Sequence, residues 1–150
     1  MEWLNLDVIE NIRQLDAQGL GGRKAKAESD VPSETLKDIL LQISEADKKR
    51  AAEVFSFYYD FFKCVKEVDR VMKHGGTACF VVGNRTVKKI NIPTDEIIAE
   101  LFEYFGYEHL ETIIRNIPNK RMPSKNSPSN KAGDLVPTMT KEYIVNLRKL

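Results

Sequence analysis

The 150-residue sequence predicts a single domain of the α/β class, with a helical first half and a second half that contains strands. Residues 1–73 carry apolar side chains at helical spacings of three and four, interrupted by a glycine-rich loop at 19–32. Residues 74–150 change to short apolar or alternating runs around one helical pattern, in the order strand, helix, strand, loop, strand. With 42% hydrophobic and 30% charged residues, the chain can bury a core, which excludes a wholly disordered protein.

Three helices are predicted in the first half. The first spans residues 3–15, and the second follows Ser33, whose side chain suits an N-cap. The third is expected to begin after a cap at Ser44 and to end near Gly75, which can adopt a left-handed conformation. Its long apolar stripe is interpreted as core, although the aromatic members could also form a base-stacking platform. The stripe comprises Ala51, Val54, Phe55, Tyr58, Phe61, Phe62, Val65, Val68, Val71 and Met72.

Strands and one further helix are predicted in the second half. Residues 77–82 form a continuous apolar run, typical of a strand buried on both faces of a parallel sheet. Thr94 is expected to cap a helix, and residues 110–117 and 142–148 are expected to form strands. The first two strands, joined through the helix, predict a parallel pair, whereas the last strand can run antiparallel to its neighbour. Three strands are few for a parallel sheet, so we expect the sheet to be incomplete.

Several classes of protein are excluded or disfavoured by composition. No apolar run has the length of a membrane-spanning helix, and the acidic N-terminal residues are unlike a secretory signal. Cys64 and Cys79 have no metal or redox spacing, and the two histidines belong to no paired ligand motif, so no metal site is expected. We interpret the chain as a cytoplasmic protein with reduced thiols.

Charge is distributed unevenly along the chain. Residues 113–150 contain eight Lys or Arg against two Asp or Glu, whereas the other residues contain 15 basic against 20 acidic side chains. This asymmetry is typical of a surface that faces a polyanion, and the alternative is a solvated basic tail.

Several segments resemble the S-adenosylmethionine-dependent DNA amino-methyltransferases of restriction-modification systems. The first is Val68–Asn84, which reads as a helix ending Arg-Val-Met-Lys, then Gly-Gly, then a strand ending Val-Val-Gly-Asn. The others are residues 3–7, 92–98, 105–107, 117–123 and 139–145. The resemblance implies methylation of N4 of cytosine or N6 of adenine in double-stranded DNA, with the target base flipped out. It also implies a partial Rossmann-like methyltransferase sheet that supplies strands 5, 6 and 7 of the family order 3-2-1-4-5-7-6.

Two hallmarks of that family are absent from this sequence. There is no Asp/Asn/Ser-Pro-Pro-Tyr/Phe tetrapeptide, and the glycine-rich stretch at 19–23 follows a helix where a cofactor loop follows a strand. We therefore expect no catalytic and no cofactor-binding residue in this chain. A complementary methyltransferase chain would supply both motifs, bind S-adenosylmethionine, and pair with the open edge of the strand at 77–82. The alternatives are an inactive truncated methyltransferase and a non-catalytic module for DNA binding or protein interaction.

The resemblance also implies binding residues. Asn84 is predicted at the rim of the target-base pocket, with a simple turn residue as the alternative. The loop at 118–137, called the basic loop, is predicted to contact DNA phosphates, and the alternative is a solvated loop. The predicted DNA-binding residues are Asn119, Lys120, Arg121, Lys125 and Lys131, joined by Arg23 and Lys24.

Overall fold

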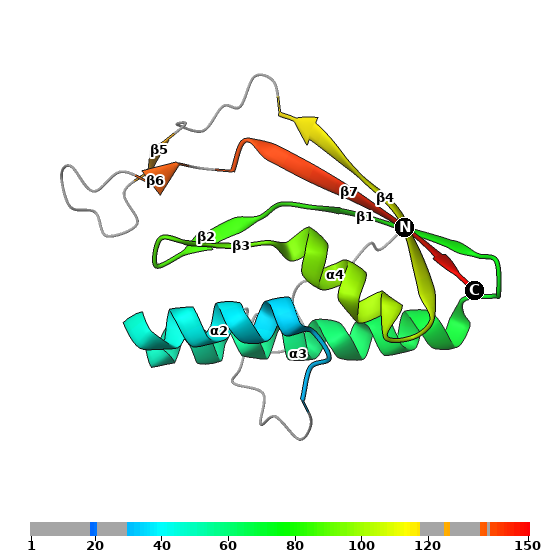
Figure 1. The fold of residues 1–150 in the computed structure, drawn as a ribbon, viewed down its shortest axis with the longest axis horizontal. Coiled ribbons are helices and arrows are strands. Elements are labelled where there is room, and N and C mark those ends of the chain that lie inside the picture. Colours follow the sequence, from blue (N-terminus) through cyan, green and yellow to red (C-terminus); the bar gives the residue numbers. More distant parts are fainter. Residues whose placement is uncertain (1–18, 21–29, 118–124, 127–135, 138) are drawn as a thin grey trace, which may run out of the picture.

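Three helices lie on one face of a three-stranded sheet in the computed structural model, which describes residues 19–20, 30–117, 125–126, 136–137 and 139–150 (Figure 1). The helices are α2 (Glu34–Ala46), α3 (Lys48–Val71) and α4 (Thr94–Glu103). The strands of this sheet are β1 (Thr77–Val82), β4 (Tyr107–Asn116) and β7 (Lys141–Lys149). The predicted helix at 3–15 lies outside the described residues.

The caps of the first two described helices follow from their side chains. The Oγ atom of Ser33 accepts a hydrogen bond of 3.0 Å from the N–H of Leu36, which confirms the predicted cap of α2. The predicted cap of α3 at Ser44 is wrong, because Ser44 lies inside α2. Asp47 caps α3, and its carboxylate accepts from the N–H of Arg50 at 3.1 Å. The chain becomes extended at Asp47, which ends α2. This conformation places the Asp47 carboxylate where it can accept a hydrogen bond from a backbone N–H in the first turn of α3.

The core forms where α3 and α4 pack beneath the sheet. Phe102 and Leu101 of α4 and Val145 and Leu147 of β7 are fully buried. Aromatic residues of α3 pack against this core as predicted, with the Phe61 ring centroid 6.1 Å from that of Phe80 in β1. The exception in the predicted stripe is Val71, the last residue of α3, which is 65% exposed.

Strand β7 lies between β1 and β4 and runs antiparallel to both. The antiparallel last strand is therefore confirmed, whereas the predicted parallel pair is wrong. Strands β1 and β4 run in the same direction, but β7 occupies the position between them. This order is the relative order that the family resemblance implies for strands 5, 7 and 6. The assignment to a Rossmann-like sheet remains a prediction.

Strand β1 has the predicted bounds but not the predicted burial. Its residues alternate, with Ala78 buried, and Cys79 and Val81 exposed. The helices cover only one face of the sheet, so side chains on the other face remain open among the described residues. The expectation of a strand buried on both faces is therefore wrong for this part of the chain.

A hairpin that the sequence analysis missed follows β1. It consists of β2 (Arg85–Val87) and β3 (Ile90–Ile92), joined by Lys88 and Lys89 with φ values of 51° and 68°. Such turns usually contain Asn or Gly, and a Lys-Lys pair carries no such signal. The alternation of Val87, Ile90 and Ile92 was the available sign of a hairpin.

Smaller differences concern the ends of elements. The N-cap of α4 is Pro93 and not Thr94, which is the first helical residue. Strand β4 begins at Tyr107, earlier than predicted, because Gly106 with a φ of 81° turns the chain directly into the sheet. Two short strands, β5 (Lys125–Asn126) and β6 (Val136–Pro137), pair within the predicted basic loop.

Candidate functional site

Most of the predicted DNA-binding residues lie outside the described part of the chain. The backbone of Lys125 belongs to β5, but its side chain lies outside the described part, as do all of the other predicted DNA-binding residues. These are Asn119, Lys120, Arg121, Lys131, Arg23 and Lys24. Their role in binding DNA remains a prediction, and Asn84 is the predicted site residue whose surroundings the structure describes.

Asn84 joins the end of β1 to the beginning of α4. Its Nδ2 donates to Oδ1 of Asp95 at 2.7 Å, and its Oδ1 accepts from the N–H of Asp95 at 3.4 Å. The N-cap residue of α4, Pro93, offers no side-chain hydrogen bond, so Asn84 supplies a cap from a distant part of the sequence. The residue thus has a positioning role, which neither of the two sequence interpretations included, and its place at a pocket rim remains a prediction.

Further polar groups lie close to this junction. The hydroxyl groups of Tyr58 and Thr94 are hydrogen-bonded at 3.0 Å, which joins α3 to the first residue of α4. Burial raises the pKa of Tyr58, although the hydrogen bond to Thr94 and the charge of Arg85 oppose that effect. In open α/β sheets, ligands bind beside the carboxyl ends of the strands. The carboxyl end of β1 is therefore the candidate functional site of this chain.

Gly83 tests whether this end of β1 could itself hold a cofactor. A Cβ atom built at Gly83 would lie 1.7 Å from Sδ of Met139. The space beside this glycine is therefore filled by a side chain of the same protein and is not a cradle for a ligand. The described residues do not fit a site for S-adenosylmethionine at this turn.

The edge of β1 that faces away from β7 is unpaired among the described residues. On the sheet face opposite the helices, Val81, Ile144 and Ile113 lie in one row across the three strands. Val81 is 55% exposed and Ile113 is 45% exposed. An open edge beside exposed apolar side chains is typical of a surface on which another chain segment packs.

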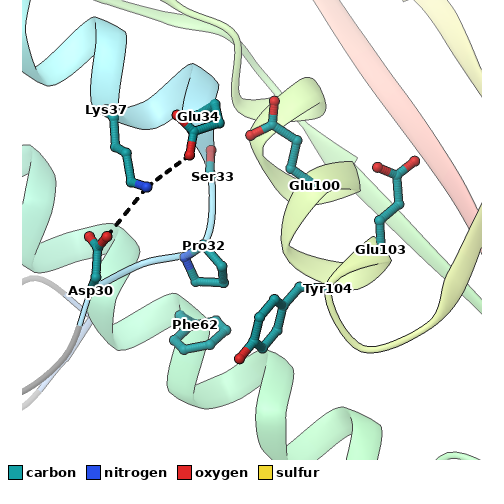
Figure 2. Close-up of a pocket in the computed structure, with 9 residues that line it drawn as sticks. All are labelled: Asp30, Pro32, Ser33, Glu34, Lys37, Phe62, Glu100, Glu103 and Tyr104. Carbon is teal, nitrogen blue, oxygen red and sulfur yellow. Dashed lines mark hydrogen bonds and ion pairs between the residues drawn. The ribbon is translucent and has the colours of Figure 1, made fainter.

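A cavity of about 670 Å³ lies between α2, α3 and α4, at the opposite end of α4 from Asn84 (Figure 2). Nζ of Lys37 there lies 2.8 Å from Oε1 of Glu34 and 3.4 Å from Oδ2 of Asp30. Glu100 accepts hydrogen bonds from the N–H and the hydroxyl of Thr35. Since Lys37 is paired with two carboxylates and the hydroxyl of Ser33 is occupied in capping α2, we assign the cavity no catalytic role.

The described residues contain no group of three or more His, Cys, Asp or Glu side chains that could hold a metal ion. None of their helices combines the length and the apolar character needed to cross a membrane. Cys64 and Cys79 are free and exposed.

Comparison with known proteins shows which protein this chain is similar to in sequence. The chain is similar in sequence to a Type II methyltransferase. That protein is M.MvaI of Kocuria varians, and the identity is 48% over 98% of this chain. The chain spans only 34% of the length of M.MvaI. No family model matches the chain, and no solved structure matches it.

Proposed function

We propose that this chain is the C-terminal part of a site-specific DNA methyltransferase of a restriction-modification system. The reaction would transfer a methyl group from S-adenosylmethionine to an exocyclic amine of a flipped cytosine or adenine. The observation that carries this proposal is the 48% identity to M.MvaI along almost the whole chain. The chain would act in the cytoplasm on double-stranded DNA.

The division of roles follows from what this chain contains and lacks. It has no Pro-Pro tetrapeptide, and at the end of β1 the side chain of Met139 fills the space beside Gly83. The chemistry of the methyl donor would therefore be supplied by a complementary methyltransferase chain. This chain would complete the sheet, place Asn84 at the pocket rim through its bonds to Asp95, and contribute basic residues toward DNA.

The open edge of β1 supports a complementary segment as the partner. If β1 corresponds to strand 5 of the family order, its free side is the position of strand 4, which carries the catalytic motif in that family. The unpaired edge and the row formed by Val81, Ile144 and Ile113 are where such a segment would pack.

The direct test combines this chain with the portion of M.MvaI that it does not cover. Each polypeptide is purified alone and together, and transfer of a tritiated methyl group from S-adenosylmethionine to DNA is measured. We expect transfer from the combination only, and no binding of S-adenosylmethionine by this chain alone in calorimetry. Binding of the cofactor by this chain alone would contradict the division of roles. A stable complex that transfers no methyl group would favour a non-catalytic DNA-binding module.

A further inference from the structure

A cluster of basic side chains gathers where the α2–α3 junction meets the β2–β3 hairpin. We call this cluster the basic corner, and it consists of Lys48, Lys49, Arg50, Arg85, Lys88 and Lys89, all exposed. Nζ of Lys88 lies 3.0 Å from Oδ2 of Asp47, the cap of α3, so the hairpin tip and the helix start are in contact. The cluster thus combines two segments that are distant in the sequence.

The first turn of α3 places positive charge where a helix disfavours it. Lys48, Lys49 and Arg50 occupy this turn, which contains no acidic residue. The N-terminus of a helix carries a partial positive charge, so cations there reduce helix stability and anions are attracted. Arg50 is paired with Glu53, but among the described residues no ion pair involves Lys48 or Lys49.

The hairpin tip shows a second local conflict. Lys88 and Lys89 both adopt positive φ, a conformation that is uncommon for residues other than Gly, Asn and Asp. Asn-Gly would suit this turn better. Both conflicts place positive charge on the same surface, and residues that oppose local stability in this way are a reason to look for a binding role.

The position of the basic corner fits the proposed substrate. The hairpin directly follows Asn84, so the basic corner lies beside the candidate pocket rim. Figure 1 shows that the hairpin tip and the α2–α3 junction lie toward the same end of the molecule as β5 and β6, which belong to the predicted basic loop.

We propose that the basic corner binds the phosphate backbone of DNA as a second contact surface of the methyltransferase. The choice of DNA as the partner rests on the proposed function. The surface pair between Lys88 and Asp47 does not oppose this role, since Lys88 remains 46% exposed and such pairs contribute little to stability. Contacts of this kind position the protein on DNA and carry no sequence information of their own.

The test measures binding of the full chain to a labelled duplex by fluorescence anisotropy between about 50 and 200 mM salt. One variant combines Lys88→Asn with Lys89→Gly, and a second combines Lys48→Gln with Lys49→Gln. The control combines Lys66→Gln with Lys73→Gln, which removes the same charge from two exposed positions, one in the C-terminal half of α3 and one just after the helix.

The slope of log affinity against log salt is negative, and each phosphate contact contributes about 0.9 to its magnitude. Each test variant should therefore reduce the magnitude of the slope by about 1.8. Affinity at about 0.1 M salt should then fall by up to roughly 60-fold, while the control stays close to the unmodified chain. The Asn-Gly variant should unfold at an equal or higher temperature, because its residues suit positive φ. A loss of DNA binding with retained stability would therefore separate a binding role from a structural one.

Three results would overturn the proposal. Equal losses in all variants would show that only net charge matters, and an unchanged salt slope in both test variants would show that the basic corner does not contact DNA. Equally tight binding of polyglutamate would indicate an acidic protein as the partner. The outcome is independent of methyl transfer. A reduced salt slope without any methyl transfer would support the basic corner as a DNA-binding surface and would contradict the proposed enzymatic function.

Discussion

The backbone of β1 allows its open edge to be blocked without disturbing its pairing with β7. The carbonyl of Gly76 accepts from the N–H of Lys149 at 2.9 Å, so this carbonyl faces β7. Backbone groups alternate in direction along a strand, so the N–H and C=O groups of Thr77, Cys79 and Val81 face the open edge. We predict that Cys79→Pro prevents the complementary methyltransferase segment from pairing with β1, while the chain itself still folds.

The size of the effect follows from the groups involved. Proline at Cys79 removes the central N–H of the three that face outward, and proline is tolerated where the N–H of an edge strand is unpaired. One lost hydrogen bond costs about 1 kcal/mol, and leaving its partner carbonyl buried and unsatisfied costs about 1–2 kcal/mol more. Together these terms give about 2–3 kcal/mol, or roughly a 30- to 140-fold weaker association.

Association is measured by calorimetry with the portion of M.MvaI that this chain does not cover, and circular dichroism checks the fold. Cys79→Ala is the matched control, because it changes the exposed side chain and keeps the N–H group. We expect Cys79→Ala to bind as the unmodified chain does. If the folded proline variant bound as tightly as Cys79→Ala, pairing at the edge of β1 would be refuted. Val81→Pro provides a second test at the next outward position.

Three other predictions concern the described fold. Ser33→Ala should lower the free energy of unfolding by about 1 kcal/mol, since it removes the acceptor for the N–H of Leu36, and an unchanged denaturation curve would argue against this cap. Phe102→Ala should cost about 3–5 kcal/mol in the same assay, because the side chain is fully buried, and a cost below about 1 kcal/mol would contradict that packing. Burial raises the pKa of Tyr58 above its ordinary value of 10.0, so the stability linked to its protonated form is complete below pH 10.0 and is lost as pH rises through the raised pKa. Tyr58→Phe should be less stable at neutral pH, because it lacks the hydrogen bond to Thr94, but it should lose less stability than the unmodified chain above pH 10.0. If stability fell equally with pH in both proteins, the raised pKa of Tyr58 would be refuted.

Local sequence patterns were sufficient for the elements whose determinants lie close together in the chain. The helical stripe of α3 and the apolar run of β1 depend on spacing within a few residues, and Ser33 lies directly before the helix that it caps. The same kind of information supported the relationship to methyltransferases, because its motifs are short and ordered along the chain. The charge asymmetry was likewise readable without a structure, although the side chains of half of the basic residues at 113–150 lie outside the described part.

The tertiary structure decided most of what depends on which segments meet. The alternating pattern of β7 indicated a strand, but its place between β1 and β4 was implied only by the family resemblance, because strand pairing depends on hydrogen bonds between distant segments. Asn84 was readable as a turn residue, yet its amide caps a helix that begins ten residues later. The basic corner exists only because the hairpin tip folds against the start of α3, which places Lys88 beside Asp47. Spacing along the chain contains no information on such contacts, since they form only when the buried faces of α3, α4 and the sheet pack together.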